Sequence, residues 1–372
     1  IIMIYYGKQN INQDDIDAVV DVLKSDFLTQ GPKVPEFEEN LKKYCNVKYA
    51  KVVSNATAAL HLGYLAVGLQ KGDIVWTSPN TFVSTANAAL FCGAEVDFVD
   101  IDQKTYNMSV EQLEKKLRQA KIDNRLPKLV VPVHFAGQSC EMKEIWELSK
   151  EYNFKVIEDA SHALGGSYLG KKVGNCEYSH MSVFSFHPVK MITTGEGGAI
   201  TTNSKALDEK VSLLRTHGIT KEEDKFKSKP HGPWYYEQHI LGFNYRLTEI
   251  QAALGISQLK RLDSFVSRRR EIASFYLENL NETITPFQHP DSNSSWHLFV
   301  IQVEDRKKVF AELLDSGIQT QVHYIPVTSQ PFHESESLKN SESVYEHCLS
   351  LPIYFDLTED QCKRVVSCIQ HD

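Results

Sequence analysis

The sequence predicts an α/β fold, with a large domain on a mostly parallel mixed sheet flanked by helices and a smaller C-terminal α+β domain. From about residue 49, short apolar runs alternate with helical stretches, which is typical of a parallel sheet covered on both faces. The chain has 372 residues, enough for two domains. Its 42% hydrophobic and 24% charged residues are typical of a globular protein.

Composition argues against several classes of protein. The formal net charge of −8, without a Lys/Arg cluster, argues against a nucleic-acid surface. No apolar run approaches the roughly 20 residues of a membrane span, and no signal peptide is evident, so we expect no membrane partner. The seven cysteines are scattered without a C-x-x-C pair, which indicates neither a disulfide framework nor a metal site. We therefore expect a cytoplasmic protein.

Two amphipathic helices are expected before the sheet. Asn12 is placed to cap the first, whose apolar residues recur at helical spacing. These residues are Ile16, Val19, Val20 and Leu23. After a turn at 28–32, the second helix carries Val34, Phe37, Leu41 and Tyr44 on one face.

Seven apolar runs have the length of buried strands: Ala50–Val53, Ile74–Thr77, Val96–Val99, Leu129–Val133, Lys155–Glu158, Met181–Phe186 and Ala199–Thr202. Ligands of such sheets bind at the carboxyl ends of the strands. Polar residues follow several of these runs, among them Ser54, His134 and Asp159. We therefore expect a binding site where these ends meet.

The last third of the chain predicts helices and a small mixed unit. A helix at 207–214 and a charged loop at 221–233 precede long helices at 248–261 and about 266–280. The tail then predicts a strand at 296–303, a helix at 306–316, a strand at 319–322 and a closing helix near 359–369. This change of pattern indicates two domains, residues 1–243 and residues 244–372.

Lys190 has no other formally charged neighbour between Ser182 and Thr194 if His187 is neutral. An amine in such an apolar setting loses its charged form easily and becomes nucleophilic. Asp159 ends an apolar strand, where a carboxylate needs a cation. The alternatives are a surface lysine with a packed stem and an aspartate that only caps the next helix.

Small residues open a helix directly after the first strand, over 54–60. Around Ala56 and Thr57, backbone N–H groups can approach a phosphate, and the helix dipole favours the anion. Ser185 is placed to add a hydroxyl, and Phe82 to stack on a flat ring. Simple N-capping and a core aromatic are the alternatives.

These features match what pyridoxal phosphate (PLP) needs from a protein. It needs a lysine to bind it covalently, a carboxylate at its ring nitrogen, a phosphate site and a stacking side chain. His162, three residues after Asp159, is placed to contact the ring near its 3-oxygen; the alternative is a core histidine.

Seven short motifs occur in one chain order: LTQGP at 28–32, SNAT at 54–57, EDASH at 158–162, SFHPVK at 185–190, GEGG at 195–198, RTHG at 215–218 and GFNYR at 242–246. Together they resemble the fold type I PLP enzymes, and more closely the sugar-nucleotide aminotransferases of the DegT/DnrJ/StrS group. The resemblance extends over essentially the whole chain. Because the lysine is present, it implies transamination rather than dehydration.

The resemblance also implies residue roles. Lys190, Asp159 and His162 would be catalytic, with Lys190 moving the proton and Asp159 paired with the ring nitrogen. The cofactor would be held further by Ala56, Thr57, Phe82 and Ser185. Asn244 would reach the phosphate of the neighbouring subunit's cofactor, which implies a homodimer with shared active sites.

Within the group, the stretches at 6–9, 25–32 and 184–187 resemble those of the enzymes of pseudaminic acid synthesis. Those enzymes transfer an amino group from glutamate to C4 of a UDP-4-keto-6-deoxy-N-acetylhexosamine. The expected substrate residues are Tyr6, Thr29, Gln30, His217, Arg246, His323 and Tyr324. The alternatives are a dTDP-4-keto or 3-keto deoxysugar for lipopolysaccharide or a natural product, and a catalytically silent regulatory protein with the same fold.

Overall fold

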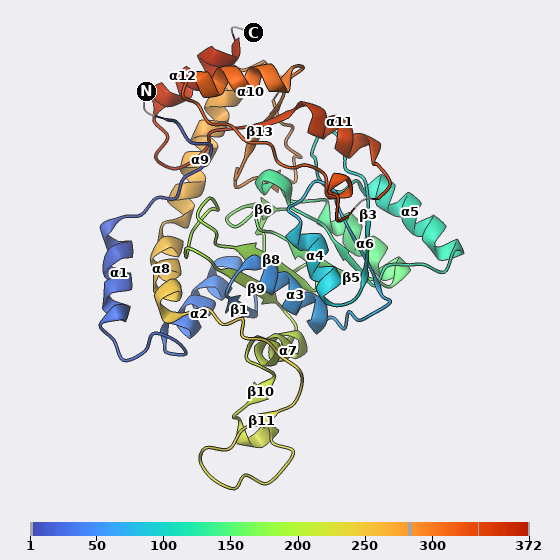
Figure 1. Ribbon diagram of the computed structural model, residues 1–372, viewed down its shortest axis with the longest axis vertical. Coiled ribbons are helices and arrows are strands. Elements are labelled where there is room, and N and C mark those ends of the chain that lie inside the picture. The colour runs from blue at the N-terminus through green and yellow to red at the C-terminus, as the bar shows by residue number, and fades with distance from the viewer. Residues whose placement is uncertain (1–2, 282–284, 334, 371–372) are drawn as a thin grey trace.

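A central sheet organises this computed structural model, which describes residues 3–281, 285–333 and 335–370 (Figure 1). Its strands are β1 (Tyr49–Val53), β2 (Ile74–Thr77), β3 (Glu95–Phe98), β4 (Leu129–Val131), β5 (Lys155–Asp159), β8 (Met181–Ser185) and β9 (Gly198–Thr202). They lie in the order β1-β9-β8-β5-β4-β2-β3. The pairs from β3 to β8 are parallel, and β9 is antiparallel to β8 and β1. The seven predicted runs are thus confirmed as strands of one mostly parallel sheet.

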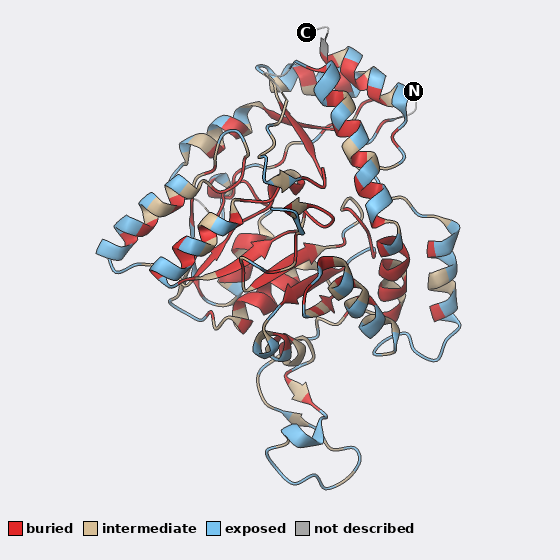
Figure 2. Ribbon diagram, turned by 180° about the vertical axis from the view of Figure 1, so that it is seen from behind, coloured by how far each residue is buried: buried red, intermediate tan, exposed pale blue. Residues whose placement is uncertain are grey.

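Helices cover both faces of this sheet. They are α2 (Lys33–Cys45), α3 (Ala56–Ala66), α4 (Ser84–Phe91), α5 (Val110–Ile122), α6 (Met142–Tyr152), α7 (Lys205–Arg215) and α8 (Glu249–Lys260). Alternate strand residues point to opposite faces, so Val53 packs with α3, α4 and α7, whereas Val52 packs with α2 and α8. Val130 joins α5 and α6 in a further cluster. Figure 2 shows the resulting buried strands at the centre of the molecule.

A smaller unit lies beside the sheet. It contains α9 (Leu262–Asn279), β13 (Phe299–Gln302), α10 (Arg306–Asp315), α11 (Lys339–His347), β14 (Cys348–Leu351) and α12 (Glu359–Gln370). Residues of all these elements except α11 share an apolar cluster with Ile4. The predicted helices at 306–316 and 359–369 are confirmed. The predicted strand at 319–322 is wrong. A strand needs consecutive paired residues, whereas this segment forms only two isolated bridges, Ile318 with Ile4 and Gln321 with Ser350.

The boundary at residue 243 stays a prediction. Helix α8, which belongs to the predicted second domain, packs against α1 (Gln13–Leu23) and α2 of the first. The outermost residues of the two predicted domains, 1–2 and 371–372, lie outside the described part of the chain.

Helix α1 forms where the sequence predicted it, but two of the four residues on its predicted apolar face are exposed and two are only half-buried. Asn12 caps it in a reciprocal capping box with Asp15. The buried Asp15 carboxylate bonds Gln258 and Arg261, and these polar contacts attach α1 to the rest of the chain. Ile16 and Leu23 remain 47% and 55% exposed.

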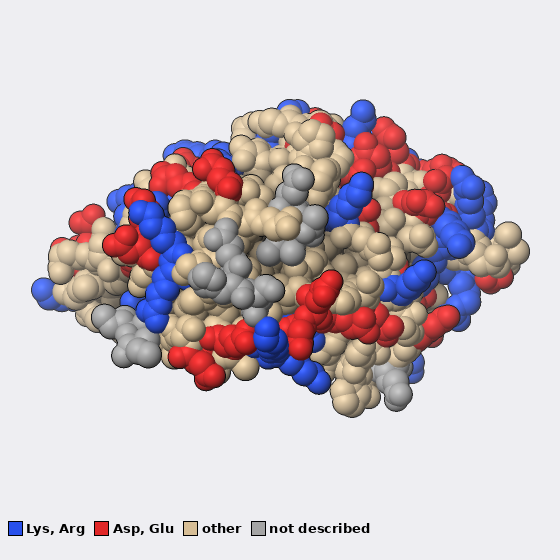
Figure 3. All heavy atoms as spheres, turned by 90° about the horizontal axis from the view of Figure 1, so that it is seen from above, with Lys and Arg blue, Asp and Glu red and all other residues tan. Residues whose placement is uncertain are grey.

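The remaining elements are short. They are η1 (Phe135–Gly137), β6 (Ser167–Tyr168), β7 (Lys171–Lys172), β10 (Ile219–Thr220), η2 (Glu223–Lys225), β11 (Glu237–Gln238), β12 (Ser292–Asn293) and η3 (Val327–Ser329). The β10–β11 hairpin extends away from the body below α7 (Figure 1). Among the described helices, none has both the length and the apolar composition needed to cross a membrane. On the face seen in Figure 3, acidic and basic side chains are interspersed.

Candidate active site

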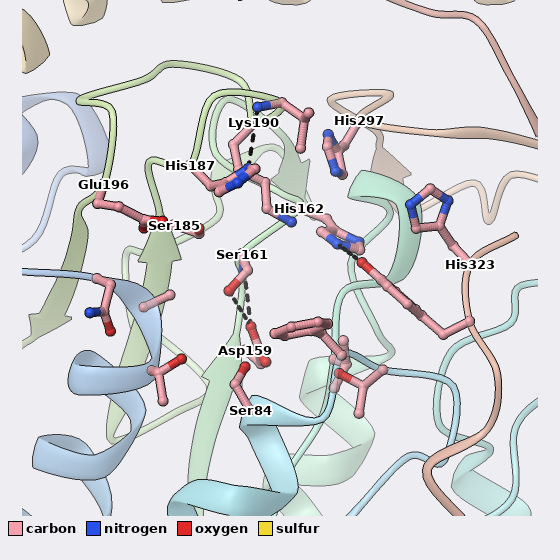
Figure 4. A pocket seen from close by; sticks show the side chains of 18 of the residues that line it. Ser84, Asp159, Ser161, His162, Ser185, His187, Lys190, Glu196, His297 and His323 are labelled. Atoms are coloured by element: carbon pink, nitrogen blue, oxygen red, sulfur yellow. Dashed lines mark hydrogen bonds between the residues drawn. The ribbon is translucent and has the colours of Figure 1, made fainter. Parts of the chain in front are cut away.

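A cavity of about 820 Å³ opens at the carboxyl ends of the central strands (Figure 4). Ten of the residues predicted from the sequence line it: Tyr6, Ala56, Thr57, Phe82, Asp159, His162, Ser185, Lys190, His323 and Tyr324. They come from the N-terminal segment, from the segment before η3, and from the ends of β1, β2, β5 and β8 or the segments directly after them. The strand order explains why they meet, because parallel strands place their carboxyl ends at one edge of the sheet.

Lys190 lies in the loop that leaves β8 and returns to β9. The loop is closed by backbone hydrogen bonds between Phe186 and both Thr194 and Gly197. Burial lowers the pKa of Lys190 to about 8, and the nearby charge of Asp159 only partly opposes this. Near physiological pH, a much larger fraction of this amine is therefore neutral and nucleophilic than of an exposed lysine.

Asp159 ends β5, and its side chain points into the same space as that of Lys190 (Figure 4). Its Oδ1 accepts hydrogen bonds from the Ser161 hydroxyl at 2.6 Å and the Ser161 N–H at 3.2 Å. Its Oδ2 accepts one from the Thr85 hydroxyl at 2.7 Å. The residue is 4% exposed and forms no ion pair with any described residue. A buried carboxylate with only neutral partners fits a cationic group of a bound molecule.

The N-terminus of α3 forms a site suited to an anion. Asn55 caps the helix, and the N–H groups of Ala56 and Thr57 fall in the first turn, where helical geometry provides no partner. The β-sheet register places Ser185 opposite Gly198. A Cβ atom on Gly198 would lie 2.7 Å from the Ala56 nitrogen, so only glycine allows β9 to come this close to the helix. The residues present therefore fit a phosphate.

His162 is held by two hydrogen bonds. Its Nδ1 accepts from the Ala136 N–H at 3.3 Å, and its Nε2 lies 2.9 Å from the Tyr324 hydroxyl. Burial, together with the charge of Lys190, lowers the pKa of His162 well below its ordinary value. Burial also lowers the pKa of His323 to about 3, so both imidazoles are neutral at physiological pH.

Five predicted residues do not line this cavity. Thr29 and Gln30 lie in an exposed loop before α2, and His217 is exposed at the base of the β10–β11 hairpin. Asn244 is exposed, and Arg246 is half-buried beside the end of β1. Their predicted roles stay predictions.

Several residues at the cavity were not predicted as site residues. Ser84, Ser161, Glu196 and His297 line the cavity, and Thr85 bonds Asp159. Ser161 had a local signal, because an aspartate side chain commonly bonds the backbone two residues further on. His297 comes from the segment before β13, and no sequence spacing relates it to Lys190.

A buried acid lies directly before Asp159. Glu158 accepts hydrogen bonds from His134 Nε2 at 2.7 Å and from the Ser182 hydroxyl at 2.6 Å. The Cys140 N–H donates to His134 Nδ1 at 3.1 Å, which leaves Nε2 to donate to Glu158. Burial raises the pKa of Glu158, but these hydrogen bonds outweigh burial, and its pKa lies below the ordinary value. This network fixes the end of β5 that carries Asp159.

Comparisons with known proteins agree over nearly the whole chain. The sequence profile of the DegT/DnrJ/EryC1/StrS aminotransferase family matches residues 9–370. The UDP-4-amino-4,6-dideoxy-N-acetyl-beta-L-altrosamine transaminase of Campylobacter jejuni is 43% identical over 375 residues, covering 98% of this chain and 96% of the relative.

Two solved structures are similar over the same extent. Helicobacter pylori PseC, an aminotransferase involved in the biosynthesis of pseudoaminic acid, has a TM-score of 0.90 at 34% identity, covering 99% of this chain and 98% of PseC. A putative sugar aminotransferase from Streptococcus pneumoniae, solved in its PLP form, has a TM-score of 0.88 at 25% identity, covering 99% of this chain and 98% of that one.

Proposed function

This chain belongs to the DegT/DnrJ/EryC1/StrS aminotransferase family, and on that premise we propose that it uses PLP to transfer an amino group from glutamate to C4 of a UDP-4-keto-6-deoxy-N-acetylhexosamine. The observation that carries the proposal is that a nucleophilic Lys190 lies in one cavity with a buried Asp159 whose hydrogen-bond partners are all neutral. The names of the Campylobacter and Helicobacter relatives support the sugar and its place in pseudaminic acid synthesis.

The residues present fit PLP at each of its functional groups. Lys190 would bind it covalently, and Asp159 would hold a proton on its ring nitrogen. Ala56, Thr57 and Ser185 would bind its phosphate, and Phe82 would stack on its ring. When bound, PLP supplies an electron-withdrawing ring that stabilises negative charge on the carbon from which a proton is removed.

Lys190 and Asp159 would have different tasks with protons. Lys190 Nζ would remove a proton from one carbon and return it to another, which a lysine with a lowered pKa does near neutral pH. Asp159 would face the ring nitrogen, and its two hydroxyl partners, which donate to both carboxylate oxygens, would hold it in that orientation.

The sugar is expected at the end of the cavity lined by Tyr6, His323 and Tyr324. Tyr6 and His323 contact each other, with ring centroids 5.6 Å apart. His323 Nδ1 also lies 2.8 Å from the Ser350 hydroxyl, which orients the ring. These side chains would discriminate among sugars, since the ring chemistry is common to all of them.

We also propose a homodimer with shared active sites. Several large apolar residues near the N-terminus are exposed in the single chain, namely Ile11, Ile16, Leu23, Phe27 and Leu28. Such a group indicates a surface that a partner covers. Asn244 and Arg246 flank Tyr245, which lines the cavity, and would serve the partner's site. The seven cysteines are all free, which is consistent with a reducing cytoplasm.

A substrate panel tests the proposed function. Purified protein would be incubated with PLP, glutamate and each of several keto-sugar nucleotides, and 2-oxoglutarate would be measured. We expect turnover of the UDP-4-keto-6-deoxy-N-acetylhexosamine. Turnover of only a dTDP-4-keto or 3-keto sugar would reject the proposed substrate. A colourless protein that never binds PLP would indicate the silent regulatory alternative.

A further inference from the structure

The hydrogen bond between His162 and Tyr324 has a direction that the backbone determines. The Ala136 N–H donates to His162 Nδ1, so this nitrogen carries no proton. The ring is neutral because burial lowers the pKa of His162. Its single proton is therefore on Nε2, and His162 must donate to the Tyr324 oxygen, 2.9 Å away.

The backbone that imposes this direction is itself constrained. Ala136 has a φ of 58°, a left-handed conformation that is unfavourable for a residue with a Cβ. Its carbonyl accepts from the Leu298 N–H at 3.2 Å, which holds the turn in place. The Ser295 hydroxyl donates to the His162 carbonyl at 2.9 Å. Strain maintained by surrounding contacts is typical of functional sites.

The Tyr324 hydroxyl consequently has its own proton free. A phenol oxygen that accepts from His162 cannot also donate to it. No other hydrogen bond to this hydroxyl is formed by a described residue. Burial raises the pKa of the Tyr324 phenol, so it keeps its proton at neutral pH. The hydroxyl lines the cavity, and Figure 4 shows His162 between Lys190 and His323.

We propose that Tyr324 is an obligate hydrogen-bond donor to the keto oxygen of the sugar substrate, and that His162 is the positioning residue that fixes this polarity. The proposal rests on the proposed aminotransferase function. A carbonyl oxygen gains negative charge as a nucleophile adds to its carbon and the C=O π electrons move to oxygen. A fixed O–H donor stabilises that charge while its proton stays on Tyr324. A donor of fixed direction also selects a ligand with an acceptor at this point.

Neutron diffraction on deuterated crystals of the holoenzyme locates the deuterium atoms and so determines which residue donates in the His162–Tyr324 hydrogen bond. We expect deuterium on His162 Nε2 and none on Nδ1, with the Tyr324 hydroxyl deuterium directed into the cavity. An Ala136→Gly variant keeps the N–H and relaxes the strained φ, so it should show the same arrangement. Deuterium on Tyr324 directed at His162 Nε2 would overturn the proposal, whatever the activity of the enzyme.

Kinetics with the keto sugar test the function of that donor. Tyr324→Phe should lower kcat on the order of 100-fold with a smaller change in KM, as expected for a donor that acts mainly in the transition state. The control Tyr345→Phe removes a hydroxyl outside the cavity and should leave kcat unchanged. Wild-type kcat in Tyr324→Phe would overturn the proposal, whereas no turnover by the wild type would instead reject the proposed function.

Two substitutions of His162 distinguish its hydrogen bond to Tyr324 from its packing in the cavity. A glutamine at 162 can place an amide N–H near the position of Nε2, whereas an asparagine is too short. We expect kcat to fall less in His162→Gln than in His162→Asn, and His162→Asn to resemble Tyr324→Phe. Equal losses in both variants would overturn the positioning role of His162.

Discussion

The Thr85 hydroxyl donates a 2.7 Å hydrogen bond to Asp159 Oδ2 from the first turn of α4. Thr85 is fully buried, and its own oxygen lies 2.9 Å from the Thr81 hydroxyl. A chain of two hydroxyls thus ends on the carboxylate. This chain keeps Asp159 oriented without supplying a positive charge, which leaves the carboxylate available to a bound cation.

Replacing Thr85 with valine removes this donor at nearly constant volume. The buried carboxylate would lose one of its hydroxyl partners, so Thr85→Val should destabilise the protein by about 1–3 kcal/mol. Urea unfolding of the apo protein measures this. Thr81→Val is the matched control and should cost less, because Thr81 bonds a neutral hydroxyl rather than a carboxylate. A larger loss in the control would contradict this ranking.

The reaction of the apo protein with PLP should depend on the lowered pKa of Lys190. Only the neutral amine is nucleophilic, so the rate of covalent chromophore formation should rise with pH through a midpoint near 8. Stopped-flow absorbance measures the rate, with Nα-acetyl-lysine as the control for titration of PLP itself. A midpoint near the ordinary lysine value of 10.5 would show that burial does not activate Lys190.

Glu158 should contribute stability that acid removes. Its pKa in the folded protein lies below the ordinary value of 4.5, so its contribution is present above that pH and lost as the pH falls through the folded pKa. Glu158→Gln should cost roughly 3 kcal/mol at pH 7, and its difference from the wild type should shrink below about pH 4.5.

Urea unfolding across this pH range would follow the difference. Glu95→Gln, at an exposed glutamate, is the control and should change the free energy of unfolding little. A Glu158→Gln difference that stays constant down to acid pH would contradict the assignment.

The outward apolar side of α1 should bind a second copy of the chain. Ile16→Glu together with Leu23→Glu would place two charges on this surface and should shift the protein from dimer to monomer. Sedimentation velocity measures the proportions of dimer and monomer. Ile122→Glu alters a more exposed residue on α5 and should leave the dimer intact. An unchanged dimer in the double variant would place the interface elsewhere.

The strands of the sheet and several residues of the candidate site could be predicted from the sequence, because both depend on local patterns. Apolar runs of strand length marked the strands, and an acid or a small polar residue directly after a run marked the site. Asp159 was identified in this way, whereas Ser185 lies within a predicted strand and Ala56 opens the helix after one. Helix α1 shows the limit: its periodicity predicted the helix, but burial of Asp15 rather than Ile16 depends on distant Arg261.

The rest of the site depends on tertiary contacts that no spacing reveals. Thr85 and His297 reach the cavity only because α4 and the segment before β13 fold against β5. The direction of the His162–Tyr324 bond requires the N–H of Ala136, which lies in an irregular turn. Which residue donates in this hydrogen bond is set by one backbone N–H, whose position is known only from the folded structure.

The fate of the amino nitrogen tests the central claim most directly. The holoenzyme would be supplied with [15N]glutamate and the UDP-4-keto-6-deoxy-N-acetylhexosamine, and the product would be analysed by NMR. We predict 15N bonded to C4 of the sugar, with one 2-oxoglutarate formed for each product. Nitrogen at another carbon, or a sugar recovered unchanged beside a PLP-loaded enzyme, would contradict it.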